Sequence, residues 1–313
     1  MRCIKCQAKA VTEIRQHNAA YCAEHFFGHF ENQVRRNIRR YRMCAEKDRI
    51  LVAVSGGKDS LALWDVLVNF GYQTAGLHIH LGIGGYSDKG LEAAQGFARA
   101  RNLELITVNV AQDYGMAIPE LAQTLRRAPC SGCGLTRRYI FNREASERGY
   151  NVLATGHNLD DEAATLLGNV LHWDMEHLPR QHPALETTHP KFVRKIKPLY
   201  TLSEKETATY CLLKRIRYHA DECPNAAGAR SLIYKHALNE IELNSPGAKL
   251  RFVRGFLEKA RAALSAQPVA LRECLSCGQP TTTERCAFCR LWDQALARRK
   301  KSQAVRLASF PAL

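Results

Sequence analysis

The stretch that most constrains the fold is a strand-like run followed by glycines and a helix-like run, over residues 49–68. Apolar and β-branched residues fill positions 50–54, which predicts a buried strand. Ser55, Gly56 and Gly57 interrupt that pattern, and apolar residues then recur at helical spacing from Leu61. A glycine turn between a strand and a helix N-terminus presents backbone N–H groups to an anion. We therefore expect a phosphate-binding loop at this point of the chain.

The loop differs from a Walker P-loop, because no G-x-x-x-x-G-K-[ST] spacing occurs. It resembles instead the pyrophosphatase-loop signature of enzymes that cleave ATP to AMP and pyrophosphate. An ordinary turn that happens to contain glycines is the alternative. The nucleotide site is favoured because six residues match in the required strand and helix context, namely Ser55, Gly56, Gly57, Lys58, Asp59 and Ser60.

Strands alternate with helices from residue 49 to about residue 200. The patterns predict strands over 49–54, 74–80, 104–110 and 152–155, and helices near 60–70, 89–101, 134–148 and 160–172. Such alternation indicates the α/β class, with a doubly wound and mostly parallel sheet and ligands at the carboxyl ends of its strands.

The charge balance favours a polyanionic partner. Lysine and arginine number 45 against 30 acidic residues, a formal net charge of +15. Basic clusters recur at residues 35–42, 126–127, 137–138 and 298–301. A solvated helix face explains any one cluster, but the set together favours nucleic acid. No run of eighteen apolar residues and no signal-peptide pattern occurs, so we expect a soluble cytoplasmic protein with no membrane segment.

The spacing of the cysteines points to metal sites rather than disulfides. Eight of the twelve cysteines fall in C-x-x-C pairs. Two short-spaced pairs of soft ligands close a tetrahedral zinc site. One such set is Cys3, Cys6, Cys22 and His25, with His17 as a competing fourth ligand. A second set forms a compact zinc ribbon, Cys274, Cys277, Cys286 and Cys289.

The central C-x-x-C, Cys130 and Cys133, has no second pair to complete a zinc site. It is expected at or just before a helix N-terminus, with Arg137 and Arg138 within about the first turn. Both features lower a thiol pKa. Cys223, in a loop before a proline, is the most credible third thiol, whereas Cys211 is expected in the core. Three thiolates would suit a [4Fe-4S] cluster with one open iron. A redox pair, a persulfide carrier and structural thiols remain alternatives.

Two further strand ends are candidate parts of the nucleotide site. The strand at 74–80 runs into a glycine-rich loop, 81–87, that is able to approach an adenine or ribose. The strand at 152–155 runs into Gly156-His-Asn-Leu-Asp-Asp-Glu162. Acidic residues complement the dipole in the first turn of a helix. The dipole explains one or two of these acids, but not why Gly-His-Asn precedes them at a strand end that faces the expected nucleotide. A carboxylate that binds Mg²⁺ or positions the reacting group is therefore favoured.

The composition shifts along the chain predict five segments. They are an N-terminal zinc finger (1–27), a catalytic domain (28–225, beginning with a basic linker helix at 28–47), C-terminal helices (226–268), a zinc ribbon (269–295) and a basic tail (296–313). Apolar stripes at Leu232, Ile233, Ala237 and Ile241, and again over 252–257, are expected in the core. The tail beyond Trp292 carries little structure-forming pattern.

The combination resembles the tRNA 2-thiolation enzymes of the TtuA family, relatives of TtcA and of the eukaryotic cytosolic thiouridylases. The resemblance spans about the whole chain. It implies an adenine nucleotide alpha hydrolase-like fold flanked by two small zinc-binding modules. It also implies a tRNA uridine 2-sulfurtransferase, in which ATP adenylates the C2 carbonyl oxygen of the base and sulfur then displaces AMP.

The resemblance assigns roles to residues and cofactors. The implied cofactors are ATP, Mg²⁺, a [4Fe-4S] cluster and two Zn²⁺. Nucleotide-contacting positions are Ala53, Ser55, Gly56, Gly57, Lys58, Asp59, Ser60, Ile79 and Gly156. Catalytic positions are Asp161, Arg137 and the cluster ligands Cys130, Cys133 and Cys223. The zinc ligands are Cys3, Cys6, Cys22 and His25 in one module and Cys274, Cys277, Cys286 and Cys289 in the other.

Arg137 stands where members of that family often carry lysine. Arginine keeps the charge, so phosphate contact survives, but it cannot release a proton. The resemblance further suggests 5-methyluridine at position 54 of tRNA as target, a ubiquitin-like thiocarboxylated carrier or sulfide as donor, and a homodimer. TtcA-like or wobble-uridine thiolation, a lysidine synthetase-type ligase and a non-enzymatic RNA-binding zinc protein are the alternatives.

Overall fold

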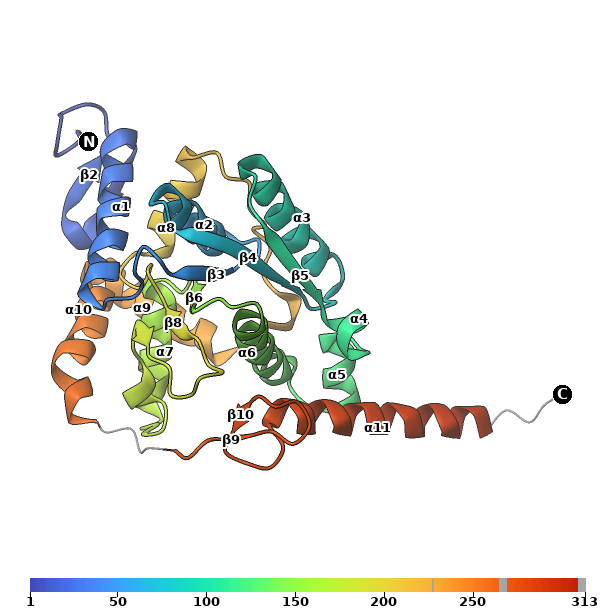
Figure 1. Cartoon of the computed structure of the whole chain (residues 1–313). Helices are drawn as coiled ribbons and strands as arrows, with labels where there is room; N and C mark the ends of the chain where they lie inside the picture. The colour runs from blue at the N-terminus through green and yellow to red at the C-terminus, as the bar shows by residue number, and fades with distance from the viewer. Residues whose placement is uncertain (227, 265–268, 309–313) are drawn as a thin grey trace.

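The centre of the molecule is a six-stranded sheet with the order β5-β4-β3-β6-β8-β7 (Figure 1). The strands are β3 (Arg49–Ala53), β4 (Gln73–His80), β5 (Leu105–Asn109), β6 (Val152–Thr155), β7 (Ala184–Leu185) and β8 (Arg194–Ile196). Every neighbouring pair is parallel except β7 with β8. This computed structural model describes residues 1–226, 228–264 and 269–308.

The order of the strands places a topological switch point at the end of β3. The chain first runs outward from β3 to β4 and β5, and then returns to add β6 on the other side of β3. The chain therefore leaves β3 and re-enters at β6 on its two sides, and the carboxyl ends of these strands lie next to each other at the switch point, where α/β folds bind ligands. The predicted phosphate loop and the segment after residue 155 both start at this switch point.

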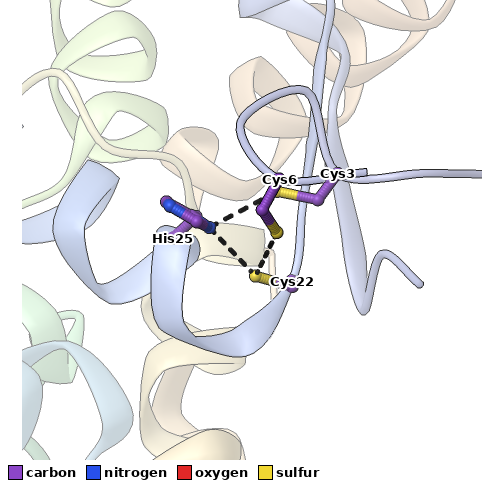
Figure 2. A group of neighbouring side chains, drawn as sticks. All are labelled: Cys3, Cys6, Cys22 and His25. Atoms are coloured by element: carbon purple, nitrogen blue, oxygen red, sulfur yellow. Dashed lines mark hydrogen bonds between the residues drawn. The ribbon is translucent and has the colours of Figure 1, made fainter. Parts of the chain in front are cut away.

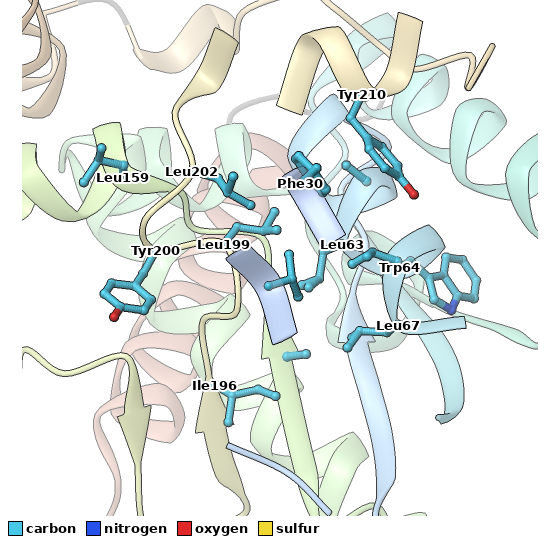
Figure 3. Close-up of a cluster of buried hydrophobic side chains, with 14 of the residues drawn as sticks. Phe30, Leu63, Trp64, Leu67, Leu159, Ile196, Leu199, Tyr200, Leu202 and Tyr210 are labelled. Carbon is cyan, nitrogen blue, oxygen red and sulfur yellow. The ribbon is translucent and has the colours of Figure 1, made fainter. Parts of the chain in front are cut away.

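Alternating side chains of β3 enter two separate hydrophobic cores. Ile50 and Val52 pack in the first core, and Leu51 and Ala53 pack in the second, as the twofold periodicity of a strand requires. Figure 3 shows part of the first core, where Phe30, Leu63 and Tyr210 lie together.

The helices cover both faces of the sheet, so the predicted doubly wound α/β class is confirmed. Elements over the first core are α1 (Ala23–Arg40), α2 (Lys58–Asn69), α3 (Gly84–Arg101), α7 (Leu159–Leu171), α8 (Glu204–Leu213), α9 (Arg230–Asn244) and α10 (Ala248–Gly255). Elements over the second core are α4 (Val110–Tyr114), α5 (Ile118–Leu125), α6 (Pro129–Glu147) and α11 (Ala287–Ala308).

Short elements complete the two small modules and the connections. Two-stranded hairpins form from β1 (Thr12–Ile14) with β2 (Ala19–Tyr21), and from β9 (Arg272–Glu273) with β10 (Pro280–Thr281). Single helical turns are Arg15–His17, Leu178–Arg180, Pro224–Ala226 and Arg261–Ala263, and Phe256–Ala260 is a π-helical turn.

Three sequence expectations about helices are wrong. The tail beyond Trp292 continues as α11, whose Trp292 and Ala295 are buried against the second core. The first amphipathic helix ends at Arg40 instead of residue 47. The stripe on α9 is largely exposed, with Ile233 at 61% and Ile241 at 51%, because α9 packs through Tyr234 and Leu238 instead.

The segment boundaries stay a prediction, and parts of them lie outside the described residues, namely 265–268 before the ribbon and 309–313 in the tail. The 252–257 stripe packs against the first core as expected. Among the described residues, no helix is both long and apolar enough to cross a bilayer.

Candidate functional site

The loop after β3 is shaped for an anion. Gly57 is the N-cap of α2, and no side chain caps the helix there, which leaves its first amide groups available. The Ser60 hydroxyl donates to the Gly57 carbonyl at 2.9 Å and accepts from the Ser55 amide at 3.2 Å. Ser60 is buried, so its hydroxyl stabilises the turn. Its assignment as a phosphate contact stays a prediction.

At two positions of the site only glycine fits, because another stretch of backbone lies too close for a β-carbon. Gly56 has φ +86°, and a β-carbon there would lie 2.2 Å from the Gly90 carbonyl oxygen in α3. A β-carbon on Gly156 would lie 2.8–2.9 Å from backbone atoms of Asp59 and Ser60. Gly156 thus lets the end of β6 pack against the loop, whatever contact it also makes with a nucleotide.

Replacement of Gly56 by alanine should destabilise the folded protein by more than about 1 kcal/mol, because both the backbone conformation and the space are incompatible with a side chain. Thermal unfolding of the purified variant measures this. Gly85→Ala is the matched control, because nothing lies within 4 Å of the position of its β-carbon. An unfolding midpoint for Gly56→Ala equal to that of the control would contradict this reading of the loop.

Asp59 is anchored by residues that are distant in the sequence. Its Oδ1 atom accepts from Asn158 Nδ2 at 3.1 Å and from the Thr207 hydroxyl at 2.5 Å. Its other oxygen lies 3.0 Å from Lys58 Nζ. Desolvation acts to lower the pKa of Lys58, but the Asp59 carboxylate raises it overall. Lys58 therefore stays charged beside the loop.

The acidic turn after Gly156 forms the start of α7, as expected. Asn158 caps the helix and forms a reciprocal capping box with Asp161. Each acid also meets a lysine from elsewhere: Asp160 contacts Lys249, Asp161 contacts Lys235 at 2.7 Å, and Glu162 contacts Lys197 at 2.7 Å. Sequence reasoning missed all three lysines, because no local pattern marks them.

Desolvation acts to raise the pKa of Asp161, but Lys235 lowers it below its ordinary value. A carboxyl group with a depressed folded-state pKa stabilises the fold above its unfolded pKa and loses that contribution as pH falls through the folded pKa. Asp161→Asn should therefore cost about 1 kcal/mol at pH 7 and progressively less below about pH 4. Denaturant unfolding at the two pH values measures this, with Asp161→Asn/Lys235→Gln as the double variant. An equal difference at both pH values would contradict the ion pair.

The central C-x-x-C opens α6, with Pro129 as the first helical residue. Cys130 is exposed, and its Sγ contacts the Asn225 carbonyl oxygen at 3.4 Å. The His219 amide donates to the Gly56 carbonyl at 2.8 Å. The segment 219–225, which carries Cys223, thus contacts the phosphate loop at one end and Cys130 at the other.

The expected lowering of thiol pKa is wrong for Cys133. Its burial raises the pKa, Arg137 lowers it by less, and the neighbouring charges of Cys223 and Cys130 raise it further. Arg137 also lies two turns into α6, not in its first turn. The three thiols share one neighbourhood, but in the described part of the chain they do not gather as tightly as a single metal ion requires.

Buried polar atoms without partners surround the same space. His78 Nε2, His219 Nε2 and Asn225 Nδ2 make no hydrogen bond within the described residues. His78 and His219 both approach Gly90, beside the phosphate loop. Desolvation lowers the pKa of His78 to about 4, so its ring is neutral. Buried donors or acceptors of this kind are usually paired in native proteins, so they are candidate contacts for a bound water, ion or ligand.

Arg137 lies within electrostatic reach of several strand ends. Its charge lowers the pKa of Cys133 and contributes to the lowered pKa of His157. Ala53 and Ile79, the two other predicted nucleotide contacts, end or nearly end β3 and β4 and are buried. The loop at 81–87 is partly helical, because α3 begins at Gly84. The roles of Arg137, Ala53 and Ile79 stay predictions.

The N-terminal metal ligands converge (Figure 2). The Cys6 and Cys22 sulfurs lie 3.7 Å apart, and His25 Nδ1 lies 3.2 Å from Cys22 Sγ and 3.7 Å from Cys3 Sγ. Tetrahedral zinc with bonds of about 2.3 Å separates its sulfurs by about 3.8 Å. The set fits zinc. His17 groups instead with His29 and the buried Glu206.

The ribbon ligands converge equally well. Cys277 and Cys286 sulfurs are 3.8 Å apart, and Cys274 and Cys289 sulfurs are 3.9 Å apart. The ribbon and α11 pack on the helix that carries the central thiols. Trp292 Nε1 donates to the Thr136 hydroxyl at 3.2 Å, and the Phe288 ring stacks on Tyr139 at 3.7 Å between centroids.

Comparison with known families decides the affiliation. Residues 29–235 match the PP-loop domain family, and residues 2–27 match the family described as "2-thiouridine synthetase TtuA, N-terminal LIM domain". The chain belongs to the TtuA family of PP-loop enzymes. The predicted family is thereby confirmed. LIM domains bind zinc, in agreement with the four converging ligands of the N-terminal module.

Relatives of this TtuA-family chain carry consistent names. A "tRNA-5-methyluridine(54) 2-sulfurtransferase" of Thermus thermophilus is 54% identical, over 96% of this chain and 94% of its own. One from Pyrococcus horikoshii, with the same name, is 43% identical over 93% and 94%. The solved structure of "U34-tRNA thiolase NcsA from Methanococcus maripaludis with its [4Fe-4S] cluster" superposes with a TM-score of 0.80 at 29% identity, covering 94% of this chain and 96% of that one.

Proposed function

We propose that this chain is an ATP-dependent tRNA uridine 2-sulfurtransferase. The observation that carries the proposal is the segment 219–225, whose backbone touches the phosphate loop at Gly56 and the Cys130 thiol through Asn225. A loop that activates a substrate and thiols that deliver sulfur must face the same atom, and this segment joins the two. The names and high identity of the relatives support the same activity.

The reaction has two steps. The C2 carbonyl oxygen of the uridine attacks the α-phosphorus of ATP, and pyrophosphate leaves. A hydrosulfide then attacks C2, the C2–O bond breaks, AMP leaves and the sulfur loses its proton, so that the base carries C2=S. A thiocarboxylate sulfur attacks in the same way, and water must then cleave the bond between that sulfur and the acyl group, which releases the carrier as a carboxylate. Amide groups at the N-terminus of α2 and Lys58 would hold the pyrophosphate charge. Arg137 would stabilise charge on the phosphate, and it cannot act as a proton donor.

The residues fit the cofactors that the family implies. Cys130, Cys133 and Cys223 would hold three irons of a [4Fe-4S] cluster, which supplies an open iron for sulfide when it is bound. Asp161 and Asp59 carry carboxylates that suit Mg²⁺ beside the phosphates. The two four-ligand sets would hold Zn²⁺ and stabilise the small modules that frame the sheet.

Position 54 of tRNA is the favoured target, because the relatives with the highest identities given above carry that name. Position 34 is the second candidate, supported by the fold similarity to the U34-tRNA thiolase. A ubiquitin-like thiocarboxylated carrier or free sulfide would donate sulfur. We further propose a cytoplasmic homodimer.

Deletion of the gene and mass spectrometry of tRNA nucleosides test the function and the target together. We expect 2-thio-5-methyluridine to disappear and to return when the gene is restored. Loss of a wobble 2-thiouridine instead would move the target to position 34. Unchanged levels of all thiolated nucleosides would refute the proposed function.

A further inference from the structure

A basic groove lies between α5 and α11, the two helices that pack against the start of α6, which carries the exposed Cys130. Its volume is about 920 Å³, and its lining includes Glu120, Gln123, Thr124, Arg126, Arg298 and Arg299. We name it the α5–α11 groove. Figure 1 shows α11 lying against α5 and continuing beyond it. The groove forms only because the tail, expected to be unstructured, is a helix.

The packing of α11 on α5 holds two arginines along the groove. The Arg298 guanidinium donates to the Thr124 carbonyl oxygen at 3.4 Å. Arg299 lies 3.3 Å from the Glu120 carboxylate, and its side chain is still 36% exposed. Arg126, which ends α5 with φ +53°, pairs with no carboxylate in the described part of the chain. The exposed Arg127, Lys300 and Lys301 add positive charge nearby.

The lining suits a sugar-phosphate backbone better than a protein surface. Besides its arginines it offers amide and hydroxyl side chains, including Gln123, Thr124, Ser302 and Gln303, and it contains no aromatic residue. Arginine, serine, threonine and glutamine are the usual donors to phosphate oxygens. Protein interfaces depend instead on apolar and aromatic centres.

The position of the groove relates it to the reaction. Cys130 is four positions after Arg126, and a chain of that length reaches at most about 14 Å. A second basic surface, on α1, is built by Arg36 and Arg39 among others. It covers the first core, on the sheet face opposite to α6. The groove, by contrast, lies in the same layer as the helix that carries Cys130.

We propose that the α5–α11 groove binds the sugar-phosphate backbone of the tRNA substrate and thereby delivers the target base to Cys130. This inference rests on the proposed function. It adds a location for the RNA and assigns a role to α11.

The inference is tested by measuring how tightly the metal-loaded protein binds an unmodified tRNA transcript. Fluorescence anisotropy gives Kd at a series of salt concentrations. Arg126→Gln/Arg298→Gln should raise Kd at least about tenfold and reduce the slope of log K against log salt by about 2. Arg36→Gln/Arg39→Gln removes the same charge from the opposite face and should change Kd less than about threefold.

The outcomes separate the two proposals. Wild-type protein that neither binds nor thiolates tRNA refutes the proposed function. If the wild-type protein binds and thiolates tRNA, and the two double variants change Kd equally, only the proposal that the groove binds tRNA is refuted. A third outcome would also overturn the inference. If the groove variant binds tRNA normally but thiolates it more slowly when a protein donates the sulfur, and not when sulfide does, the groove binds the protein donor.

Stability controls accompany the binding measurement. Both double variants should keep the unfolding midpoint and zinc content of the wild type. If Arg126→Gln/Arg298→Gln loosens α11, Arg127→Gln/Lys301→Gln replaces it, because both of these side chains are exposed and form no ion pair among the described residues. That variant should weaken binding and reduce the slope in the same direction, and an unchanged Kd would overturn the inference.

Discussion

Cys130→Ser should reduce tRNA thiolation by roughly three orders of magnitude, equivalent to about 4 kcal/mol of transition-state stabilisation, while ATP binding stays within about threefold of wild type. Serine matches the size of cysteine but supplies no thiolate for iron or sulfur. The contacts that shape the phosphate loop, from Ser60, Asn158 and Thr207, do not involve Cys130. Steady-state thiolation and nucleotide titration measure the two effects.

Replacement of a cysteine outside the site is the control for general effects of losing a thiol. Cys44 is half-buried beside Tyr72 and belongs to none of the candidate metal sites. Cys44→Ser should retain thiolation near the wild-type rate. If Cys130→Ser keeps full activity, the C-x-x-C takes no part in sulfur transfer. That result would favour a ligase that uses the same phosphate loop.

Loss of the zinc ribbon should have the second large effect. Cys274→Ser removes a buried ligand, and we expect the zinc content to fall by one per chain with a stability loss of several kcal/mol. Trp292 and Phe288 contact Thr136 and Tyr139 of α6. Without these contacts, the backbone amides of α6 should exchange hydrogen faster than in the wild type. Hydrogen–deuterium exchange read by mass spectrometry follows residues 130–145.

The N-terminal module provides the matched comparison. Cys3→Ser should also remove one zinc, yet it should leave exchange in α6 unchanged, since that module borders α1 and the first core. Equal loss of protection in α6 for both variants would mean that the ribbon does not specifically stabilise the cysteine-bearing helix.

Local pattern was sufficient to predict much of the fold. The strand at residues 152–155 has the predicted bounds, and the glycine turn at residues 55–57 lies between β3 and α2 as expected. Both depend on nearest neighbours in the chain. The two sets of zinc ligands converge for the same reason, since each is close-spaced in sequence.

Long-range packing accounts for what the sequence did not reveal. The partners of Asp59 and Asp161, namely Thr207 and Lys235, come from helices that only the assembled sheet brings near. On α9, the periodicity of the sequence indicated an apolar face but not which side of the helix would face the core. The contact between α9 and α7 decides which side is buried. The pKa of Cys133 rises because burial outweighs the nearby arginine, and burial is a property of the folded chain.

The separation of the metal ligands along the chain implies an order of assembly. Cys3 and His25 are 22 residues apart, and Cys274 and Cys289 are 15 apart, so each zinc site closes a short loop. The contact between Cys130 and Asn225 spans 95 residues and requires the parallel sheet to be in place. A nascent chain can therefore capture its first zinc ion soon after residue 25 is free, whereas the three-cysteine site must wait for the whole domain. Under the proposed function, iron starvation should accordingly leave a folded, zinc-loaded protein that is competent to receive the proposed cluster later.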